Sequence, residues 1–319
     1  MIRVAVLIPC HNEEVAIGRV VHQFRSALPQ AVVFVYDNNS TDRTVAEASA
    51  AGAVVRSEPL QGKGNVVRRM FADIEADAYI LVDGDDTYDA TAAPEMLRLL
   101  VDGPLDMVTA ARISDTAGAY RTGHRTGNVV LTRLVTILFG DRVSDMLSGY
   151  RAFSRRFVKS FPALSTGFET ETEFTVHALE LAMPVGELTA YYKDRPAGSV
   201  SKLHTYTDGL RILRTILLLI KEARPFQFFF AGTAVLVLVA LVLGIPVVAD
   251  FMTTGLVPRL PTAMLATALM GLAFLSCTCG FILDSVARGR KEAKRMAYLA
   301  IPSIGSADIP WSRHAADAG

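Results

Sequence analysis

The sequence predicts an α/β protein in which a mostly parallel sheet is flanked by helices and followed by a hairpin of two membrane-spanning helices. Two observations predict this fold class. In residues 1–115, short apolar runs alternate with amphipathic stretches, and strands that alternate with helices are typical of a parallel sheet. Near the C-terminus, two apolar stretches lack any charged residue, and each reaches the roughly 20 residues that a helix needs to cross a bilayer.

The expected strands are short runs rich in β-branched and aromatic residues that end at polar residues, glycine or proline. They cover residues 4–8, 32–36, 54–56 and 79–82, and the stretches between them, residues 14–27, 42–51 and 63–75, are expected to be helical. Ser40, Thr41 and Asp42 begin the second helix with residue types that cap helices. Polar clusters follow the strand ends, which is where ligands of parallel sheets bind. Residues 116–200 are expected to complete the sheet.

The membrane hairpin is expected at residues 226–249 and 262–283. A buried hairpin in a soluble core is the alternative, but two such runs in tandem exceed ordinary core-helix lengths. The connecting loop, residues 250–261, carries one Arg and no Lys, whereas the outer flanks are basic. The positive-inside rule therefore places both flanks in the cytoplasm and predicts a multi-pass protein of the inner or plasma membrane.

The chain is thus expected to have four parts: a cytoplasmic domain of residues 1–204, an amphipathic juxtamembrane helix of residues 205–224, two spans within residues 225–287, and a cytoplasmic tail of residues 288–319. The apolar run at residues 4–9 is too short for a signal peptide, so the first domain is expected to remain in the cytoplasm. In residues 210–220 leucine and isoleucine recur at helical spacing beside basic residues. That pattern is typical of a helix in the membrane interface, with an ordinary packing helix as the alternative.

Composition excludes several classes of protein. The 32 basic and 32 acidic residues give zero net charge, so no overall field attracts nucleic acid. Three cysteines without zinc-binding spacing indicate neither a disulfide framework nor a zinc site. The hydrophobic content of 51% is high, and the excess is concentrated near the C-terminus.

Several short motifs lie at the ends of the expected strands, and together they identify a family. In chain order they are Pro9-Cys10-His11-Asn12-Glu13, Asp37-Asn38-Asn39-Ser40, Gln61-Gly62-Lys63-Gly64, Asp83-Gly84-Asp85, Ser148-Gly149-Tyr150-Arg151, Phe168-Glu169-Thr170-Glu171 and Arg195-Pro196-Ala197-Gly198-Ser199. In this order and spacing they resemble family 2 glycosyltransferases, and more closely the polyprenyl- or dolichyl-phosphate sugar synthases. The resemblance covers about the first 200 residues. It implies a GT-A fold, an inverting reaction and a divalent metal.

The resemblance and the chemistry of the donor agree on the roles of the acidic pair. A nucleotide-sugar brings two phosphates that gain negative charge as the glycosidic bond breaks, and Mg²⁺ or Mn²⁺ bound by carboxylates stabilises that charge. The resemblance makes Asp85 the firmer metal ligand and places Asp83 nearer the donor. It also places a set of residues around the nucleotide-sugar: Pro9, Asn12, Glu13, Asp37, Asn39, Lys63, Gly64, Asp83 and Glu171. Glu171 is expected to touch sugar hydroxyls or to support the site from behind.

The acceptor is expected to be a lipid phosphate, which is mostly dianionic at neutral pH because its second pKa lies near 6. Positioning cations then matter more than a strong base, and guanidinium groups fit phosphate oxygens. The candidate catalytic residues are Arg112, Arg125, Asp145, Ser148 and Arg151, and the candidate lipid phosphate-binding residues are Arg195 and Lys202. Asp145 is expected to orient the nucleophile or to act as a weak base, and the alternative is a structural role as a cap or as the partner of Arg151.

The expected function is transfer of a hexose from UDP-glucose to undecaprenyl phosphate. The two-span hairpin is similar to that of bacterial polyprenyl-phosphate glucosyltransferases. Mannose synthases of this type often carry Gln where this chain has Thr87, so GDP-mannose is the second choice. A processive polysaccharide synthase would need a Gln-x-x-Arg-Trp motif, and the single Trp is Trp311. A non-catalytic nucleotide-binding membrane protein is the rival of a different class, and a homo-oligomer stays open.

Overall fold

The computed structural model describes residues 2–103, 105–113, 144–167, 169–196 and 225–304. The chain divides into two compact units, Met1–Ile216 with Lys294–Gly319, and Leu217–Ala293. Three of the sequence predictions, namely Arg125, Lys202 and the juxtamembrane helix of residues 205–224, lie outside the described residues.

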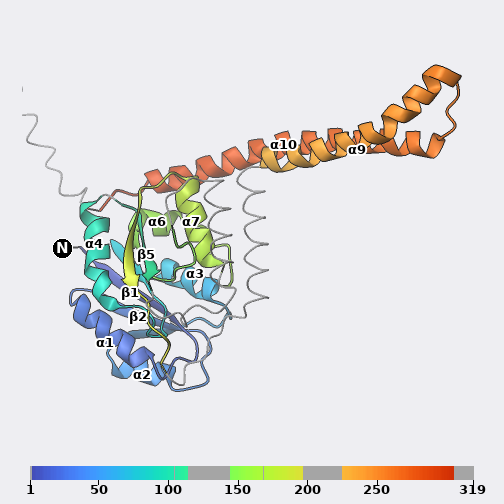
Figure 1. Cartoon of the computed structure of the whole chain (residues 1–319). Helices are drawn as coiled ribbons and strands as arrows, with labels where there is room; N and C mark the ends of the chain where they lie inside the picture. Colours follow the sequence, from blue (N-terminus) through green and yellow to red (C-terminus); the bar gives the residue numbers. More distant parts are fainter. Residues whose placement is uncertain (1, 104, 114–143, 168, 197–224, 305–319) are drawn as a thin grey trace, which may run out of the picture. The chain divides into compact units, whose positions relative to one another are not determined.

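The first unit is built on a seven-stranded sheet with the order β3-β2-β1-β4-β6-β5-β7. Figure 1 labels β1, β2 and β5 of this sheet together with helices around it. The strands are β1 (Val4–Cys10), β2 (Val32–Asp37), β3 (Val54–Ser57), β4 (Ala78–Leu81), β5 (Met107–Ile113), β6 (Arg151–Ser154) and β7 (Val185–Tyr191). All neighbours pair in parallel except β6, which is antiparallel to both β4 and β5. The mostly parallel sheet predicted from the sequence is therefore confirmed.

Helices cover both faces of this sheet because alternate residues of each strand point to opposite sides. The helices are α1 (Ile17–Ala27), α2 (Thr44–Ala50), α3 (Lys63–Asp73), the 3-10 helix η1 (Ala90–Ala92), α4 (Ala93–Asp102), α6 (Arg155–Ser160) and α7 (Thr170–Glu180). Val6 and Ile8 of β1 join the core formed with α1 and α4. Ala5 and Leu7 join the opposite core, which contains Phe71 of α3 and the aromatic side chains of α6 and α7.

The strand order reverses between β1 and β4, which is where open α/β sheets form a ligand-binding crevice at the carboxyl ends of their strands. From β1 the chain passes to β2 and β3 on one side and then returns to β4 on the other. At such a reversal the two loops diverge, which leaves room for a ligand. Since β5 and β7 run in the same direction, their carboxyl ends reach the same edge of the sheet. The predicted motifs after β1, β2, β3 and β4 therefore lie along one edge.

The second unit consists of two long apolar helices. These are α9 (Pro225–Thr254) and α10 (Leu260–Leu299), and both are long and apolar enough to cross a membrane. Only 6% of the most apolar window of α9 and 17% of that of α10 is buried, whereas helices in a soluble core are mostly buried. Helix α10 continues well beyond residue 283, and its last residues, from Lys294 onward, belong to the first unit.

The two helices pack through small residues and side-chain hydrogen bonds to backbone carbonyls. Thr233 Oγ1 donates to the carbonyl of Ala273 at 3.3 Å, and Ser276 Oγ donates to that of Phe229 at 3.3 Å. A Cβ placed on Gly280 would lie 3.0 Å from Cβ of Phe229. Small residues at such contacts let helix backbones approach closely in a membrane.

Replacing Gly280 with leucine is expected to weaken this packing by about 1–3 kcal/mol, because the added side chain has no space beside Phe229. Thermal unfolding of the full-length protein in detergent would measure the change. Gly271 is the matched control, since a Cβ there meets nothing within 4 Å. Equal unfolding temperatures for the Gly280→Leu and Gly271→Leu proteins would contradict the packing described here.

Candidate active site

The acidic loop after β4 lies at the crevice and carries the predicted metal ligands. The Asp83 side chain is 30% exposed and that of Asp85 is 6% exposed. Asp85 Oδ1 accepts hydrogen bonds from Thr87 Oγ1 at 2.6 Å and from the Thr87 amide at 3.2 Å. Asp85 Oδ2 pairs with Nη2 of Arg195 at 2.6 Å. Burial and the neighbouring Asp83 raise the pKa of Asp85, while Arg195 lowers it.

Lys63, at the start of α3, joins two of the predicted carboxylates. Its Nζ donates to Oδ1 of Asp83 and to Oε1 of Glu171. The side chains of Lys63 and Glu171 are only 9% and 6% exposed. Burial alone would lower the pKa of Lys63, but the charges of Asp83 and Glu171 outweigh it and hold this pKa above its usual value. Burial raises the pKa of Glu171, and Lys63 offsets part of that shift.

Gly64 and Gly149 let neighbouring segments approach this cluster closely. A Cβ on Gly64 would lie 2.2 Å from the carbonyl oxygen of Ser165, in the segment that precedes α7. A Cβ on Gly149 would lie 2.4 Å from Oδ2 of Asp83. The role of Gly64 is thus to admit the backbone that carries Glu171, and the role of Gly149 is to leave space for the Asp83 carboxylate.

Replacing Gly149 with alanine is expected to displace the Asp83 carboxylate and to weaken binding of Mn²⁺ together with UDP by about tenfold, the lower end of the effect of disturbing the support of a metal ligand. Isothermal titration of the full-length protein would measure this affinity. Gly18→Ala is the control, since a Cβ there meets only the carbonyl of Glu47 at 3.9 Å. An unchanged affinity for Gly149→Ala would show that Asp83 does not take part.

The predicted nucleotide-binding residues after β1 and β2 hold two loops together. Asn12 and Asn39 have positive φ angles of 51° and 63°, a conformation that asparagine tolerates better than most residues. Asn12 Oδ1 accepts the amide of Thr41 at 2.7 Å, and Asn39 Nδ2 donates to the carbonyl of Pro59 at 2.8 Å. The carboxylate of Asp37, which is 7% exposed, accepts the amide of Ser40.

The two remaining residues of the predicted nucleotide-binding set lie at the end of β1. Pro9 lies beside Tyr36 in the sheet register, and Glu13 is 8% exposed. The amide of Glu13 donates to Thr44 Oγ1 at 2.8 Å. The sequence-predicted residues after β1, β2, β3 and β4 are thus brought together at one edge of the sheet.

The predicted acceptor side contains a buried ion pair. Arg112, on β5, donates from Nε and Nη2 to the carboxylate of Asp145 at 2.7 and 2.8 Å. Their side chains are 17% and 9% exposed, and the Arg112 guanidinium lies 5.6 Å from the ring centre of Tyr192. Asp145 was expected either to act on the nucleophile or to cap a helix or pair with Arg151, and in the structure it pairs with Arg112.

Arg151 and Ser148 lie in the interior, which differs from the prediction that they act on substrate. Both residues are 0% exposed. Arg151 donates to the carbonyls of Met146 at 2.6 Å and Ser148 at 3.0 Å, and Ser148 Oγ donates to the carbonyl of Ala110 at 2.6 Å. Burial lowers the pKa of Arg151 to about 10. Both side chains are thus closed off from solvent, and both hold the loop that carries Asp145.

Sequence reasoning missed the contacts that organise Asp85. Thr87 was noted only as a departure from the family pattern, yet its hydroxyl donates a hydrogen bond to Oδ1 of Asp85. Tyr88 accepts a hydrogen bond from the Gly149 amide at 3.0 Å and packs against Tyr192. The family motifs contained both Arg195 and Asp85. They did not indicate that the two side chains form an ion pair, because the residues come from distant parts of the chain.

The donor set fits a divalent metal that is shared with a ligand. In the described part of the chain, no group of three or more His, Cys, Asp or Glu residues converges as a metal site. Asp83 and Asp85 supply hard carboxylate oxygens, and Mg²⁺-type sites commonly use one or two carboxylates while phosphates and water complete the shell. These two residues would hold the metal, and a diphosphate and water would complete its coordination.

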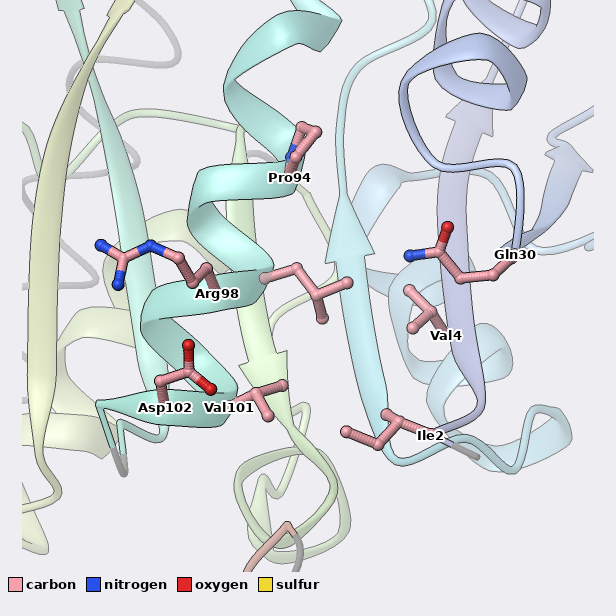
Figure 2. Close-up of a pocket in the computed structure, with 8 residues that line it drawn as sticks. Ile2, Val4, Gln30, Pro94, Arg98, Val101 and Asp102 are labelled. Carbon is pink, nitrogen blue, oxygen red and sulfur yellow. The ribbon is translucent and has the colours of Figure 1, made fainter.

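An open cleft of about 380 Å³ lies elsewhere on the first unit (Figure 2). Ile2 and Val4, at the beginning of β1, form one side, and Leu97 and Val101 of α4 form the other. Its position at the amino end of β1 is opposite to the edge that carries the motifs. The lining is mainly apolar, and its two charged residues, Arg98 and Asp102, have opposite charges, so this cleft offers no excess positive charge to a diphosphate.

Comparison with known proteins assigns the family. Residues 5–161 match the model described as glycosyl transferase family 2. Glycosyltransferase AglJ of Haloferax volcanii is 35% identical over 237 residues, which cover 72% of this chain and 78% of that protein. The chain belongs to glycosyl transferase family 2. It is therefore an enzyme, and the family resemblance stated from the motifs is confirmed.

Other relatives and solved structures agree with this family and fold. Protein RfbJ of Shigella flexneri is 54% identical over 123 residues, covering 38% of this chain and 95% of that protein. A dolichyl-phosphate hexose transferase of Haloferax volcanii is 29% identical over 221 residues, covering 69% and 95%. Glucosyl-3-phosphoglycerate synthase from Mycobacterium tuberculosis, in complex with Mn²⁺ and UDP-glucose, has a TM-score of 0.56 at 22% identity and covers 68% of this chain and 78% of that chain. The fold is thus GT-A-like.

Proposed function

We propose that this glycosyltransferase moves a hexose from a nucleotide-sugar to a polyprenyl phosphate, with inversion at the anomeric carbon. The observation that carries the proposal is the meeting of Asp83, Asp85 and Lys63 at the carboxyl edge of the sheet. The nucleophile is a phosphate oxygen of the lipid, which attacks C1 of the sugar while the bond from C1 to the nucleoside diphosphate breaks. A single displacement of this kind inverts the anomeric centre.

The donor side is proposed to bind the diphosphate through the acidic loop. When bound, Mg²⁺ or Mn²⁺ at Asp83 and Asp85 supplies positive charge to the leaving diphosphate. Asp37 selects the base or ribose by accepting a hydrogen bond, and Glu171 accepts bonds from sugar hydroxyls through its oxygen that Lys63 does not hold. UDP-glucose is the proposed donor. This choice is supported by the likeness in fold to glucosyl-3-phosphoglycerate synthase, which was solved with Mn²⁺ and UDP-glucose. GDP-mannose is the second candidate.

The acceptor side is proposed to bind the lipid phosphate through guanidinium groups. Arg112 lies in a half-buried position beside Tyr192, and its orientation is fixed by Asp145. Because the acceptor phosphate is already an anion at neutral pH, Asp145 acts by orienting Arg112 rather than by removing a proton. Arg195 and the two residues outside the described ranges, Arg125 and Lys202, complete the proposed phosphate contacts. A dolichyl-phosphate hexose transferase among the relatives supports an acceptor of this class.

The hairpin of α9 and α10 is proposed to cross the membrane twice and to anchor the catalytic domain on the cytoplasmic side. The loop between the helices carries a single basic residue, Arg259, whereas five basic residues lie between positions 288 and 295 of α10. Basic residues are retained on the cytoplasmic side. An acceptor with a long isoprenoid tail is insoluble in water, so an enzyme anchored in the bilayer meets it where it is concentrated.

The test is to incubate the detergent-purified protein with undecaprenyl phosphate, Mg²⁺ or Mn²⁺, and a panel of UDP- and GDP-sugars, and to detect glycosylated lipid by mass spectrometry. We expect metal-dependent product from UDP-glucose. Product from GDP-mannose alone would replace the donor and keep the reaction. Unmodified lipid with every donor, while nucleotide still binds, would overturn the acceptor and favour transfer of the sugar to another class of acceptor.

A further inference from the structure

Both oxygens of the metal ligand Asp85 are engaged by side chains of the protein itself. Thr87 holds Oδ1 through its hydroxyl and its amide, and Arg195 holds Oδ2 at 2.6 Å. Thr87 lies two residues along the same loop, so its contacts keep the carboxylate in a fixed orientation. Arg195 comes from the segment after β7. Its ion pair with Asp85 can therefore be broken by a movement of the Arg195 side chain alone.

A divalent cation at Asp85 and the guanidinium of Arg195 would compete for the same oxygen. The Asp85 side chain is 6% exposed, so little water is present to screen two positive groups placed beside it. Like charges in contact at a site of low dielectric repel strongly. A cation that bridges Asp83 and Asp85 therefore favours departure of the guanidinium, and the Arg195 side chain, 30% exposed, has solvent on one side into which it can move.

Lys63 is placed differently and is expected to stay. Its side chain is 9% exposed and lies between two carboxylates, the partly exposed Asp83 and the buried Glu171, so removal would take a common cation from both. The Arg195 side chain has more than three times the exposed fraction of the Lys63 side chain. Of Lys63 and Arg195, Arg195 is therefore the cation suited to exchange.

We propose that Arg195 is a displaceable counter-cation: a divalent metal takes its place at Oδ2 of Asp85, and the released guanidinium then binds the phosphate of the acceptor. This inference rests on the proposed function and adds an order of events to it. The metal and its diphosphate bind first, and the acceptor phosphate gains a cationic partner only afterwards. By thermodynamic linkage, the metal and the acceptor phosphate then strengthen each other's binding by the same factor.

The first experiment measures Mn²⁺ binding to the full-length protein without nucleotide, from the paramagnetic resonance signal of free Mn²⁺. Arg195→Gln is expected to bind Mn²⁺ about tenfold more tightly than the unchanged protein, within the usual range of coupling between sites. Arg195→Lys, which retains a more mobile charge, is expected to show a smaller gain. Equal or weaker Mn²⁺ binding by Arg195→Gln would overturn the proposal.

Arg19→Gln is the matched control because it removes the same charge from the neighbouring carboxylate. Arg19 Nε pairs with Oδ2 of Asp86 at 3.1 Å, with 55% of its side chain exposed. An exposed pair of this kind contributes little, so Mn²⁺ affinity is expected to change less than about twofold. An equal gain in both variants would show a general effect of net charge and would overturn the exchange at Asp85.

The second experiment measures binding of a short, water-soluble isoprenyl phosphate with and without Mn²⁺ and UDP. In the unchanged protein Mn²⁺–UDP is expected to strengthen this binding about fivefold, and Arg195→Gln is expected to abolish the difference. A difference that persists in Arg195→Gln would overturn the role of Arg195. Failure of Mn²⁺ to bind the unchanged protein even with UDP would instead refute the metal site of the proposed function, so the two failures are distinguishable.

Discussion

Replacing Asp85 with asparagine is expected to reduce the rate of sugar transfer by about a thousandfold. A metal bound to the leaving diphosphate contributes several kcal/mol to the stabilisation of the transition state, and about 4 kcal/mol corresponds to a factor of a thousand. Asparagine has nearly the same shape and can still accept the hydrogen bonds from Thr87. The change therefore removes the charge of the ligand and leaves its position. Steady-state rates with UDP-glucose and undecaprenyl phosphate would measure the loss.

Asp86→Asn provides the comparison for this experiment. Asp86 is the next residue, and it pairs with Arg19 and Gln23 of α1 rather than with the residues at the crevice. We expect this variant to retain transfer within a factor of a few, because its carboxylate is held by α1 and is not one of the proposed metal ligands. Similar losses in both variants would mean that the loop conformation, and not the metal-binding charge of Asp85, limits the reaction.

Most of the fold could be predicted from local patterns in the sequence. The apolar runs at residues 4–8 and 79–82 are the buried strands β1 and β4, because strands covered on both faces consist almost entirely of apolar residues. The position of β6 between β4 and β5 had no such signal. Its antiparallel pairing depends on contacts between distant segments. Helix α10 also extends past the apolar stretch, because hydropathy marks the edge of a membrane segment and not the end of a helix.

The candidate site could be predicted as a set of residues but not as a set of contacts. The motifs identified Asp83, Asp85 and Lys63, since their positions follow strand ends that meet at one edge. The partners of these side chains come from distant segments, as Glu171 and Arg195 do. Arg151 shows that a motif can also suggest the wrong contacts. An arginine in a family motif is expected to bind phosphate, yet Arg151 donates to backbone carbonyls in the interior. Burial decides between these roles, and burial depends on the complete fold.

Replacing Lys63 with methionine is expected to lower the free energy of unfolding by about 3–5 kcal/mol at neutral pH, the usual effect of removing one partner of a buried ion pair. Methionine fills a similar volume, but the carboxylates of Asp83 and Glu171 lose their common cation. Thermal unfolding of the full-length protein in detergent would measure the loss. A loss of unfolding free energy below about 1 kcal/mol is what an exposed ion pair would give. Such a result would contradict the buried pairing of Lys63 with Glu171.

The pH dependence of this loss separates an unpaired charge from a packing defect. Burial already raises the pKa of Glu171, and removal of Lys63 raises it further. A carboxyl group whose pKa is higher in the folded state binds a proton that unfolding releases, so the penalty begins above its ordinary pKa of about 4.3 and grows with pH. The deficit of Lys63→Met is therefore expected to be larger at pH 8 than at pH 5. Adding Glu171→Gln to the variant removes one unpaired charge, and we expect it to restore part of the stability at pH 8. A deficit that is equal at both pH values and unaffected by the second substitution would indicate lost packing alone.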